Sequence, residues 1–324
     1  MKILILGAGG MVGQKLVKRI LQTEFNSVIP SNIYLFDLVF PHQNNISVNL
    51  IRGDLGDPQQ IKKLAAKRFD IIFHLAAIVS GEAEENFNKG WQINLFSMWH
   101  LLEALKEEHI NSSCEYVPKI IYTSSIAVFG PPYPKTISDK FLCAPQTSYG
   151  AQKASAELLL SDFSRKGFVN GISLRLPTIC IRPGSANKAA SSFFSNIIRE
   201  PLNNKPAYLP VDTSVRHWHT SPRSAVNFLL HAIKIDFSNL NDRRAINLPG
   251  LSCTVEEQIE ALRKIAGQNV VDLIMTKPDP IIEKMVSGWP RNFDPKRALK
   301  LGFKSETTFD QIISNYISDD LGRV

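Results

Sequence analysis

Tyr149 and Lys153 are the residues of this 324-residue chain whose types and spacing point most directly to chemistry. A separation of four places both side chains on one face of a helix, one turn apart. A phenol is a poor base at neutral pH, because its pKa lies near 10. A lysine ammonium one turn away lowers that pKa, so Tyr149 could take the proton of an alcohol while hydride leaves the same carbon. The isolated pair also fits a surface tyrosine beside a solvated lysine.

Hydroxyl side chains close an apolar segment upstream of this pair. The segment Ile120–Thr123 predicts a buried strand, and Ser124 and Ser125 follow it. Active residues of open α/β sheets gather at such strand ends. We therefore expect the Ser125 hydroxyl to bond a substrate oxygen beside the Tyr149 phenol, which favours the catalytic interpretation over the surface one.

A glycine-rich turn follows the first apolar segment of the chain. Gly7, Gly10 and Gly13 permit a tight turn, a close backbone approach and close helix packing. Met11 and Val12 would open the next helix, whose N–H groups and positive dipole suit a pyrophosphate. Such turns also join strands to helices without any ligand, but the strand–turn–helix context is the one that dinucleotide binding requires.

Two aspartates extend this prediction to the adenosine half of a dinucleotide. Asp37 ends the second strand, where a carboxylate accepts hydrogen bonds from the ribose hydroxyls and repels a 2′-phosphate, so NAD is favoured over NADP. The alternative for Asp37 is a cap of a helix or turn. Asp54 could receive the adenine amino group, with Leu55 against the ring, although an ordinary aspartate turn fits the spacing equally well.

The first half of the chain alternates short apolar segments with amphipathic stretches. Helices are predicted at Val12–Leu21, Gln60–Ala66, Asn94–Glu107 and Tyr149–Arg165. Strands are predicted at Lys2–Leu6, Ile33–Phe36, Ile71–Leu75, Ile120–Thr123 and Ile172–Leu176. This alternation predicts a Rossmann-type α/β fold, with a doubly wound parallel sheet covered by helices on both faces.

The pattern becomes less regular after residue 178. We expect residues 1–178 to form the NAD-binding domain and residues 179–324 to form mainly a smaller substrate-binding lobe, with a part that returns to the first domain. Thr254 and Glu257 predict a capping box that opens a helix through Ile265. Strand-like pieces in this half are Tyr208–Val211, Ala245–Leu248 and Val270–Ile274.

Composition narrows the class of protein. The net charge is +7, but no run of Lys or Arg and no helix-turn-helix or zinc-finger pattern indicates nucleic acid, so a basic surface for small anions is favoured. The four cysteines form neither a C-x-x-C pair nor a His-rich cluster, and no metal site is implied. The chain shows no signal peptide and no apolar run of roughly 20 residues, so a cytoplasmic enzyme without a membrane segment is expected.

Several motifs occur in an order and spacing that together are specific: Gly7/Gly10/Gly13, His74–Leu75–Ala76–Ala77, Ser124–Ser125, Val128–Phe129–Gly130 and Tyr149/Lys153. In them the chain resembles the extended short-chain dehydrogenase/reductase family over essentially its whole length. The resemblance implies that Tyr149 is the general acid/base, that Lys153 holds the nicotinamide ribose and that Ser125 orients the substrate oxygen. It also implies a homodimer formed through the helices that carry Asn94 and Tyr149. The implied cofactor groove includes Leu75, Ala76, Ala77, Asn94, Thr123, Pro177 and Thr178.

A narrower resemblance concerns the substrate. Dehydratases of this family carry an acidic pair just after the position of Ser125, where this chain has Ile126 and Ala127, so dehydration is discounted. Other segments resemble the D-erythronate dehydrogenases, which oxidise the C2 hydroxyl of a four-carbon sugar acid with NAD. They are Ala77–Glu84, Leu176–Gly184, Ala189–Ser191 leading to Ile198–Leu202, and His217–His219 with Ser221–Arg223.

An anionic sugar acid needs a cation for its carboxylate and polar partners for its hydroxyls. The candidates are Ser80, Ser125, Tyr149, Thr178, Asn187, Arg199, Arg216 and His219. For each arginine a salt bridge is an equal alternative, and for His219 a packed strand is the stronger one. Two other functions stay open at this point: a redox-neutral nucleotide-sugar epimerase that retains NAD, and a non-catalytic NAD-sensing protein.

Overall fold

The computed structural model describes residues 1–22, 29–41, 48–184, 190–240 and 243–322. The chain divides into two compact units whose segments alternate along the sequence, whereas one boundary after residue 178 is expected from the sequence. The first unit consists of Met1–Ser125, Thr147–Arg175 and Val226–Ile246, and the second of Ile126–Gln146, Leu176–Ala225 and Asn247–Val324. That the second unit binds substrate stays a prediction.

A seven-stranded sheet forms the centre of the first unit, with the strand order β11-β7-β5-β4-β1-β2-β3. The strands from β3 to β5 pair in parallel with their neighbours, so their carboxyl ends share one edge. The predicted doubly wound Rossmann-type fold is confirmed. The strands are β1 (Ile3–Leu6), β2 (Ile33–Asp37), β3 (Asn49–Arg52), β4 (Ile71–His74), β5 (Lys119–Ser125), β7 (Asn170–Leu176) and β11 (Ala245–Asn247).

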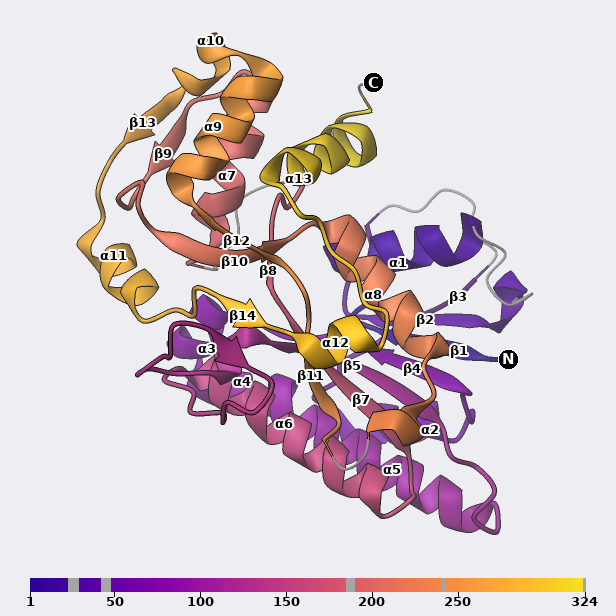
Figure 1. Cartoon of the computed structure of the whole chain (residues 1–324). Coiled ribbons are helices and arrows are strands. Elements are labelled where there is room, and N and C mark those ends of the chain that lie inside the picture. Colours follow the sequence, from indigo (N-terminus) through magenta and orange to yellow (C-terminus); the bar gives the residue numbers. More distant parts are fainter. Residues whose placement is uncertain (23–28, 42–47, 185–189, 241–242, 323–324) are drawn as a thin grey trace. The chain divides into compact units, whose positions relative to one another are not determined.

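Helices cover both faces of this sheet (Figure 1). On one face, α2, α5 and α6 close a core that includes Leu4, Tyr122 and Leu160. On the other, α1 buries Leu16, Val17 and Ile20. The helices and helical turns of this unit are α1 (Met11–Gln22), η2 (Pro30–Asn32), α2 (Pro58–Ala65), α3 (Ser80–Glu85), α4 (Phe87–Trp91), η3 (Gln92–Phe96), α5 (Ser97–Asn111), α6 (Ser148–Arg165), most of α8 (Pro222–Lys234) and η5 (Phe237–Leu240).

Two strands of this sheet show where the sequence pattern is weak. Strand β3 was not predicted, because it is an edge strand that buries none of its four side chains fully. The segment Ala245–Leu248 was predicted among the pieces of the second half, and its residues Ala245–Asn247 form β11, which joins the large sheet beside β7. Strand β3 pairs with the preceding strand β2, and β11 pairs with β7, which is far away in the sequence. Periodicity reveals neither pairing.

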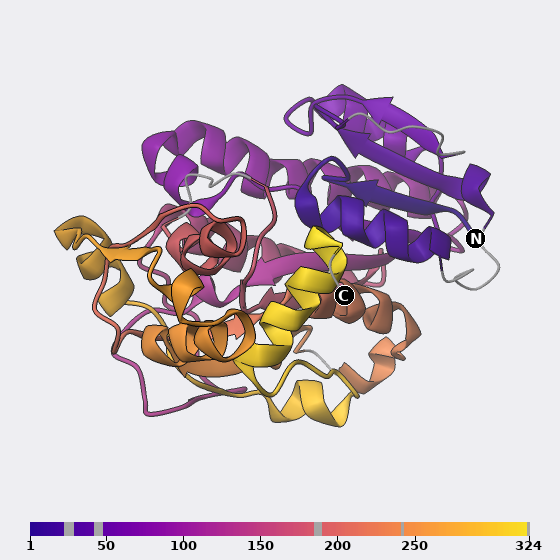
Figure 2. The ribbon, with the colours of Figure 1, turned by 90° about the horizontal axis from the view of Figure 1, so that it is seen from above.

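The second unit contains three small sheets. They are β12-β10-β8, β13-β9 and β14-β6. Helices α9 and α13 lie side by side (Figure 2). They contribute to a core that includes Phe194 and Leu262. Its strands are β6 (Ile137–Ser138), β8 (Thr178–Ile179), β9 (Ala207–Leu209), β10 (Arg216–Thr220), β12 (Leu251–Thr254), β13 (Ile274–Thr276) and β14 (Phe293–Asp294). Its helical segments are η4 (Ile126–Val128), α7 (Ser192–Leu202), α9 (Val255–Ala266), α10 (Gln268–Val271), α11 (Pro280–Ser287), α12 (Lys296–Lys300), α13 (Phe309–Tyr316) and η6 (Ile317–Leu321).

Two local predictions in this unit have opposite outcomes. The capping box at α9 is confirmed, since the Thr254 side chain accepts from the Glu257 N–H and the Glu257 side chain accepts from the Thr254 N–H. The strand predicted at Val270–Ile274 is wrong. Its first two residues belong to helix α10, where Val271 packs into the core, and a strand starts only at Ile274. Among the described residues, no helix has the length and apolar character needed to cross a membrane.

Candidate active site

The glycine turn between β1 and α1 is built from backbone contacts that exclude side chains. Gly7 has a φ of +82°, and a Cβ there would lie 2.5 Å from the Ala76 nitrogen. A Cβ on Gly13 would lie 2.5 Å from the Gly7 carbonyl oxygen. At Gly10 a Cβ would meet only that oxygen, at 3.5 Å, so the turn is open at this point. The open turn leads into the first N–H groups of α1, at Met11 and Val12, which is the arrangement that holds a pyrophosphate.

Asp37 lies beside this turn at the end of β2. Its two carboxylate oxygens accept hydrogen bonds from the Gly9 N–H at 2.8 Å and the Leu38 N–H at 2.7 Å. The capping alternative therefore describes part of what Asp37 does. A carboxylate has further lone pairs, so the same group can also accept from ribose hydroxyls. The residues of the turn and Asp37 thus fit the adenosine and pyrophosphate parts of NAD, and the ribose contact itself stays a prediction.

The second predicted adenosine contact has a clear local role. Asp54 Oδ1 accepts from the Gly56 N–H at 2.7 Å, which is the ordinary aspartate turn considered from the sequence. Leu55 is buried in the core beneath the sheet. Contacts of Asp54 and Leu55 with adenine stay predictions.

Asn94 connects the segment after β4 to the helix that carries Tyr149. It lies buried in the η3 turn, where its side-chain oxygen accepts from the Ile78 N–H at 2.9 Å. Its amide donates to the Ile78 carbonyl at 3.2 Å and to the Gln152 side chain at 2.8 Å. These bonds fix the backbone that follows Leu75, Ala76 and Ala77. Asn94 thereby shapes the expected cofactor groove, and its own contact with NAD stays a prediction.

Two side chains accept hydrogen bonds from backbone N–H groups at the start of α6. Thr147 caps the helix by accepting from the Gly150 N–H at 3.1 Å. Glu84 accepts from the Ser148 N–H at 2.6 Å, and a carboxylate at this end of a helix is also favoured by the helix dipole. Tyr149 lies between the two bonded residues, Ser148 and Gly150, so these hydrogen bonds fix its backbone position.

Lys153 is buried beside Tyr149 and the end of β5. Its side chain is 2% exposed, and Nζ donates to the Thr123 carbonyl oxygen at 2.8 Å. Nζ also lies 5.6 Å from the centre of the Tyr149 ring and 4.7 Å from that of Tyr122. Burial lowers the pKa of Lys153 to about 7, and the negative charge of Glu157 opposes that change. The structure thus brings Lys153 to Tyr149 at the strand end that carries Ser125.

Of four polar residues around Lys153, His74 is named from the sequence only within a family motif, and Tyr122, Glu157 and Arg175 are not singled out. His74 and Tyr122 pack edge to face with ring centres 5.6 Å apart, and burial lowers the pKa of His74 to about 3, with a contribution from the charge of Lys153. Glu157 is bonded to Arg175 of β7. The spacing of 149, 153 and 157 could have indicated Glu157. The partner on β7 carries no such signal, because the contact depends on the fold.

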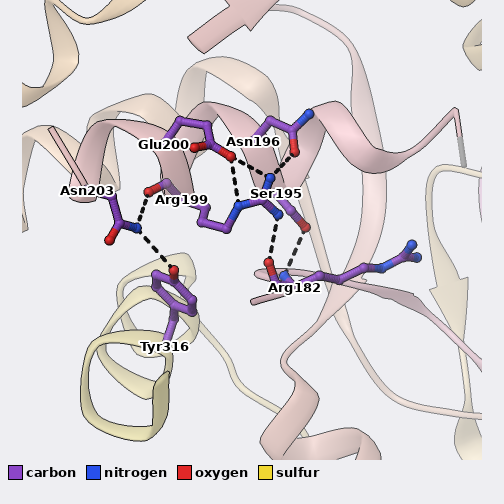
Figure 3. Close-up of polar contacts among 7 residues, drawn as sticks. All are labelled: Arg182, Ser195, Asn196, Arg199, Glu200, Asn203 and Tyr316. Carbon is purple, nitrogen blue, oxygen red and sulfur yellow. Dashed lines mark hydrogen bonds and ion pairs between the residues drawn. The ribbon is translucent and has the colours of Figure 1, made fainter. Parts of the chain in front are cut away.

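Arg199, a candidate for binding the substrate carboxylate, is buried in α7 and bonded to neighbouring groups (Figure 3). Its guanidinium donates to the Glu200 carboxylate at 2.6 and 2.9 Å and to the Asn196 side chain at 2.7 Å. It also donates to the Arg182 carbonyl oxygen at 2.9 Å. These bonds support the salt-bridge alternative, and a contact with substrate stays a prediction.

The remaining substrate candidates of the second unit lie on β8 and β10. Thr178 Oγ1 is 2.7 Å from His217 Nε2. His219 is fully buried, contacts Phe194 edge to face and has a pKa well below its usual value because of burial, which supports the packed-strand alternative. Arg216 pairs with Glu257 at 3.2 Å near the surface.

Three candidates complete the comparison of the sequence with the structure. Ser80 is the first residue of α3, and Pro177 lies between β7 and β8. Asn187 falls outside the described residues.

Comparison with known proteins defines the class. Residues 3–234 match the model of the NAD dependent epimerase/dehydratase family, and the chain belongs to this family. It is an NAD-dependent dehydrogenase of the extended short-chain type, so NAD is its cofactor.

Two relatives and one solved structure are similar over nearly the full length. The D-erythronate dehydrogenase of Cupriavidus necator is 42% identical over 98% of both chains. That of Haemophilus influenzae is 40% identical over 99% of this chain and 100% of its own. A nucleoside-diphosphate-sugar epimerase from Agrobacterium tumefaciens has a TM-score of 0.94 and 49% identity, covering 100% of this chain and 95% of its own.

Proposed function

We propose that this enzyme oxidises the C2 hydroxyl of D-erythronate, or of a close four-carbon sugar acid, to the 2-oxo acid. The observation that carries the proposal is the buried Lys153 beside Tyr149 at the end of β5, in a chain 42% identical to a D-erythronate dehydrogenase. The pair supplies an acid/base at the strand ends, and the relatives supply the substrate class. NAD, when bound, accepts the hydride that leaves C2.

In this proposal Tyr149 takes the proton of the C2 hydroxyl as the C2–H bond breaks and the carbonyl forms. The charge of Lys153 favours the phenolate, because the ammonium is buried and little water screens it. Ser125, at the end of β5, holds the substrate oxygen. Lys153 is also the residue proposed to hold the nicotinamide ribose. The Thr123 carbonyl fixes its Nζ for both tasks.

NADH absorbance tests the proposal directly. Purified protein is mixed with NAD and, separately, with D-erythronate, L-threonate and D-threonate. We expect NADH with D-erythronate and at least tenfold less with the two threonates, an order-of-magnitude expectation for a site that reads hydroxyl positions. Absence of NADH with every tetronate and related sugar acid, while NAD binding is demonstrated, would overturn it.

A second candidate is a nucleotide-sugar epimerase, which the name of the Agrobacterium protein favours. That chemistry is redox-neutral, so NAD would copurify, would not exchange and would yield no net NADH. Incubation with a nucleoside-diphosphate sugar followed by chromatography of the sugar products distinguishes the two candidates. A new epimer without NADH supports the second, and NADH from D-erythronate supports the first.

We also propose that the enzyme is a homodimer formed through the helices α5 and α6. Apolar side chains are exposed there, namely Phe96 and Trp99 around the start of α5 and Leu158 on α6. Exposed apolar patches of this kind mark association surfaces. Sedimentation should give a dimer for the wild type and a monomer for Leu158→Glu. A monomeric wild type at micromolar concentration would contradict the assignment.

A further inference from the structure

A buried carboxylate continues the helix face that carries the two proposed catalytic side chains. Tyr149, Lys153 and Glu157 are spaced by four residues in α6, so they follow one another along the same face. Glu157 is 5% exposed, and Lys153 is less exposed still. A buried carboxylate is costly unless other groups bond it. The groups that contact Glu157 therefore indicate what the buried carboxylate does.

Glu157 is held by two neighbouring strands. The Ser124 hydroxyl of β5 donates to Oε1 at 2.5 Å. Arg175 of β7 donates through Nε to Oε1 at 2.9 Å and through Nη2 to Oε2 at 2.7 Å. This two-point contact supplies the counter-charge that a buried carboxylate needs. Both oxygens are bonded, so the position of the negative charge is fixed.

Consecutive residues of β5 connect this carboxylate to Lys153. The Thr123 carbonyl accepts from Lys153 Nζ at 2.8 Å, and the next residue, Ser124, donates to Glu157. One strand end thus holds a cation and an anion that are also adjacent along α6. Strand and helix together fix the direction of the Lys153 side chain and its distance from the carboxylate.

The remaining groups around Lys153 offer little compensation for its charge. His74 on β4 is neutral near pH 7, because burial lowers its pKa to about 3. Tyr122 on β5 and Tyr149 on α6 present rings to Nζ. Arg175 on β7 is positive, but it faces Glu157. Among the described groups, Glu157 is the anion whose charge acts on Lys153, whose pKa of about 7 leaves its protonation finely balanced at neutral pH.

We propose that Glu157 is a positioning residue that sustains the positive charge of Lys153, and that Ser124 and Arg175 hold Glu157 for this task. This inference rests on the proposed function, because it assigns the charge of Lys153 a role in turnover. Without the carboxylate, Lys153 loses its proton at a lower pH and the Tyr149 phenolate loses its counter-charge. The base then forms only at a higher pH.

The variant Glu157→Gln tests this through the pH profile of turnover with D-erythronate and NAD. We expect the rising limb of kcat to move about one pH unit upward, a shift typical of removing a nearby opposite charge. Glu157→Asp keeps the charge and should bring the limb back toward the wild-type position. The control is Asp162→Asn, which removes an acidic group from the exposed side of the same helix. The rising limb of kcat in this control variant should stay at the wild-type pH.

Uniform loss of activity with an unmoved limb would overturn the proposal, because it would leave Glu157 a purely structural role. If Glu157→Gln does not fold, Glu157→Gln/Arg175→Met removes both members of the pair and should show the same shift.

A direct titration separates this inference from the proposed function. In protein labelled with [13Cε]lysine, the Lys153 resonance is identified by its absence from Lys153→Met. Its midpoint should be lower in Glu157→Gln than in the wild type, whether or not D-erythronate is turned over. Equal midpoints would refute the role of Glu157. A shifted midpoint without any NADH would instead keep that role and refute the substrate.

Discussion

Two buried cations, Lys153 in the first unit and Arg199 in the second, differ in the number of hydrogen-bond acceptors that they contact. Arg199 donates to a carboxylate, an amide and a backbone carbonyl of neighbouring residues. Lys153 donates to one carbonyl in the described contacts and otherwise faces aromatic rings. A guanidinium whose three nitrogens all donate to neighbouring groups holds its segment in place. A buried ammonium with one acceptor among the described contacts is less well stabilised. The comparison favours the salt-bridge interpretation of Arg199 and agrees with the catalytic role proposed for Lys153.

The chemical type of each cation agrees with this difference. Arginine stays charged and offers a rigid fork for several acceptors. Lysine is a point charge whose pKa moves readily when it is buried. Because the pKa of Lys153 lies near 7, neighbouring charges can change its protonation at neutral pH. The lowered pKa reduces the stability of the folded chain, but such a group suits an acid/base site.

The largest effect is expected from Lys153→Met. Turnover should fall about a thousandfold, since the phenolate loses its counter-charge. Stability should behave differently. Between pH 7 and 10.5 the unfolded chain keeps the Lys153 proton and the folded chain does not, so the wild type gains roughly 1.4 kcal/mol per pH unit across this window. Denaturation at pH 7 and 9 should show this slope in the wild type and a flatter one in the variant. Equal slopes in the two proteins would show that folding does not lower the pKa of Lys153.

The matched change in the second unit is Arg199→Met, and its effect should be on folding. Removing the guanidinium takes a donor away from the half-buried Glu200 carboxylate and from the Arg182 carbonyl, so a loss of about 3 kcal/mol in unfolding free energy is expected. NAD binding, measured by fluorescence below the unfolding transition, should stay near the wild-type value. A stable protein with a greatly raised KM for D-erythronate would show that Arg199 holds substrate after all.

Acid should destabilise the fold through buried histidines in both units. Burial lowers the pKa of His74 to about 3 and that of His217 to about 4, and that of His219 also lies well below its usual value. Above pH 6.5 they are neutral in both states, so stability is unaffected. As pH falls from 6.5 toward 4, only the unfolded chain takes up these protons, at a cost of roughly 1.4 kcal/mol per pH unit and histidine. Thermal melts should show this decline, reduced in His217→Gln. An unchanged slope in that variant would exclude His217 as a source.

The smallest effect is expected at Asp37, a carboxylate that is bonded by the backbone at an open turn. Asp37→Ala should raise the Kd of NAD about tenfold, the loss expected for a charged hydrogen-bond acceptor, and weaken the rejection of NADP. Calorimetric titrations with both dinucleotides measure the ratio. An unchanged preference would mean that another group contacts the ribose.

The sequence predicted the parts of the site whose signals are local. The glycine turn, the Tyr149–Lys153 spacing and the capping box at Thr254 each depend on residues within a few positions of one another. It did not predict the bonds of Asn94 or the pair of Glu157 with Arg175, because these join segments that meet only in the folded chain. It did not predict β3, because this edge strand buries none of its side chains fully. It did not place Ile126–Gln146 in the second unit, because that assignment depends on contacts of the folded chain.

The central claim is that Tyr149 acts as the acid/base in oxidation of D-erythronate, and Tyr149→Phe tests it most directly. NADH formation from saturating D-erythronate and NAD is measured for the wild type and the variant, with NAD binding measured in parallel. We expect strong NADH formation by the wild type and a loss of about a thousandfold in the variant, with NAD bound nearly normally. Wild-type turnover by the variant would remove Tyr149 from this role.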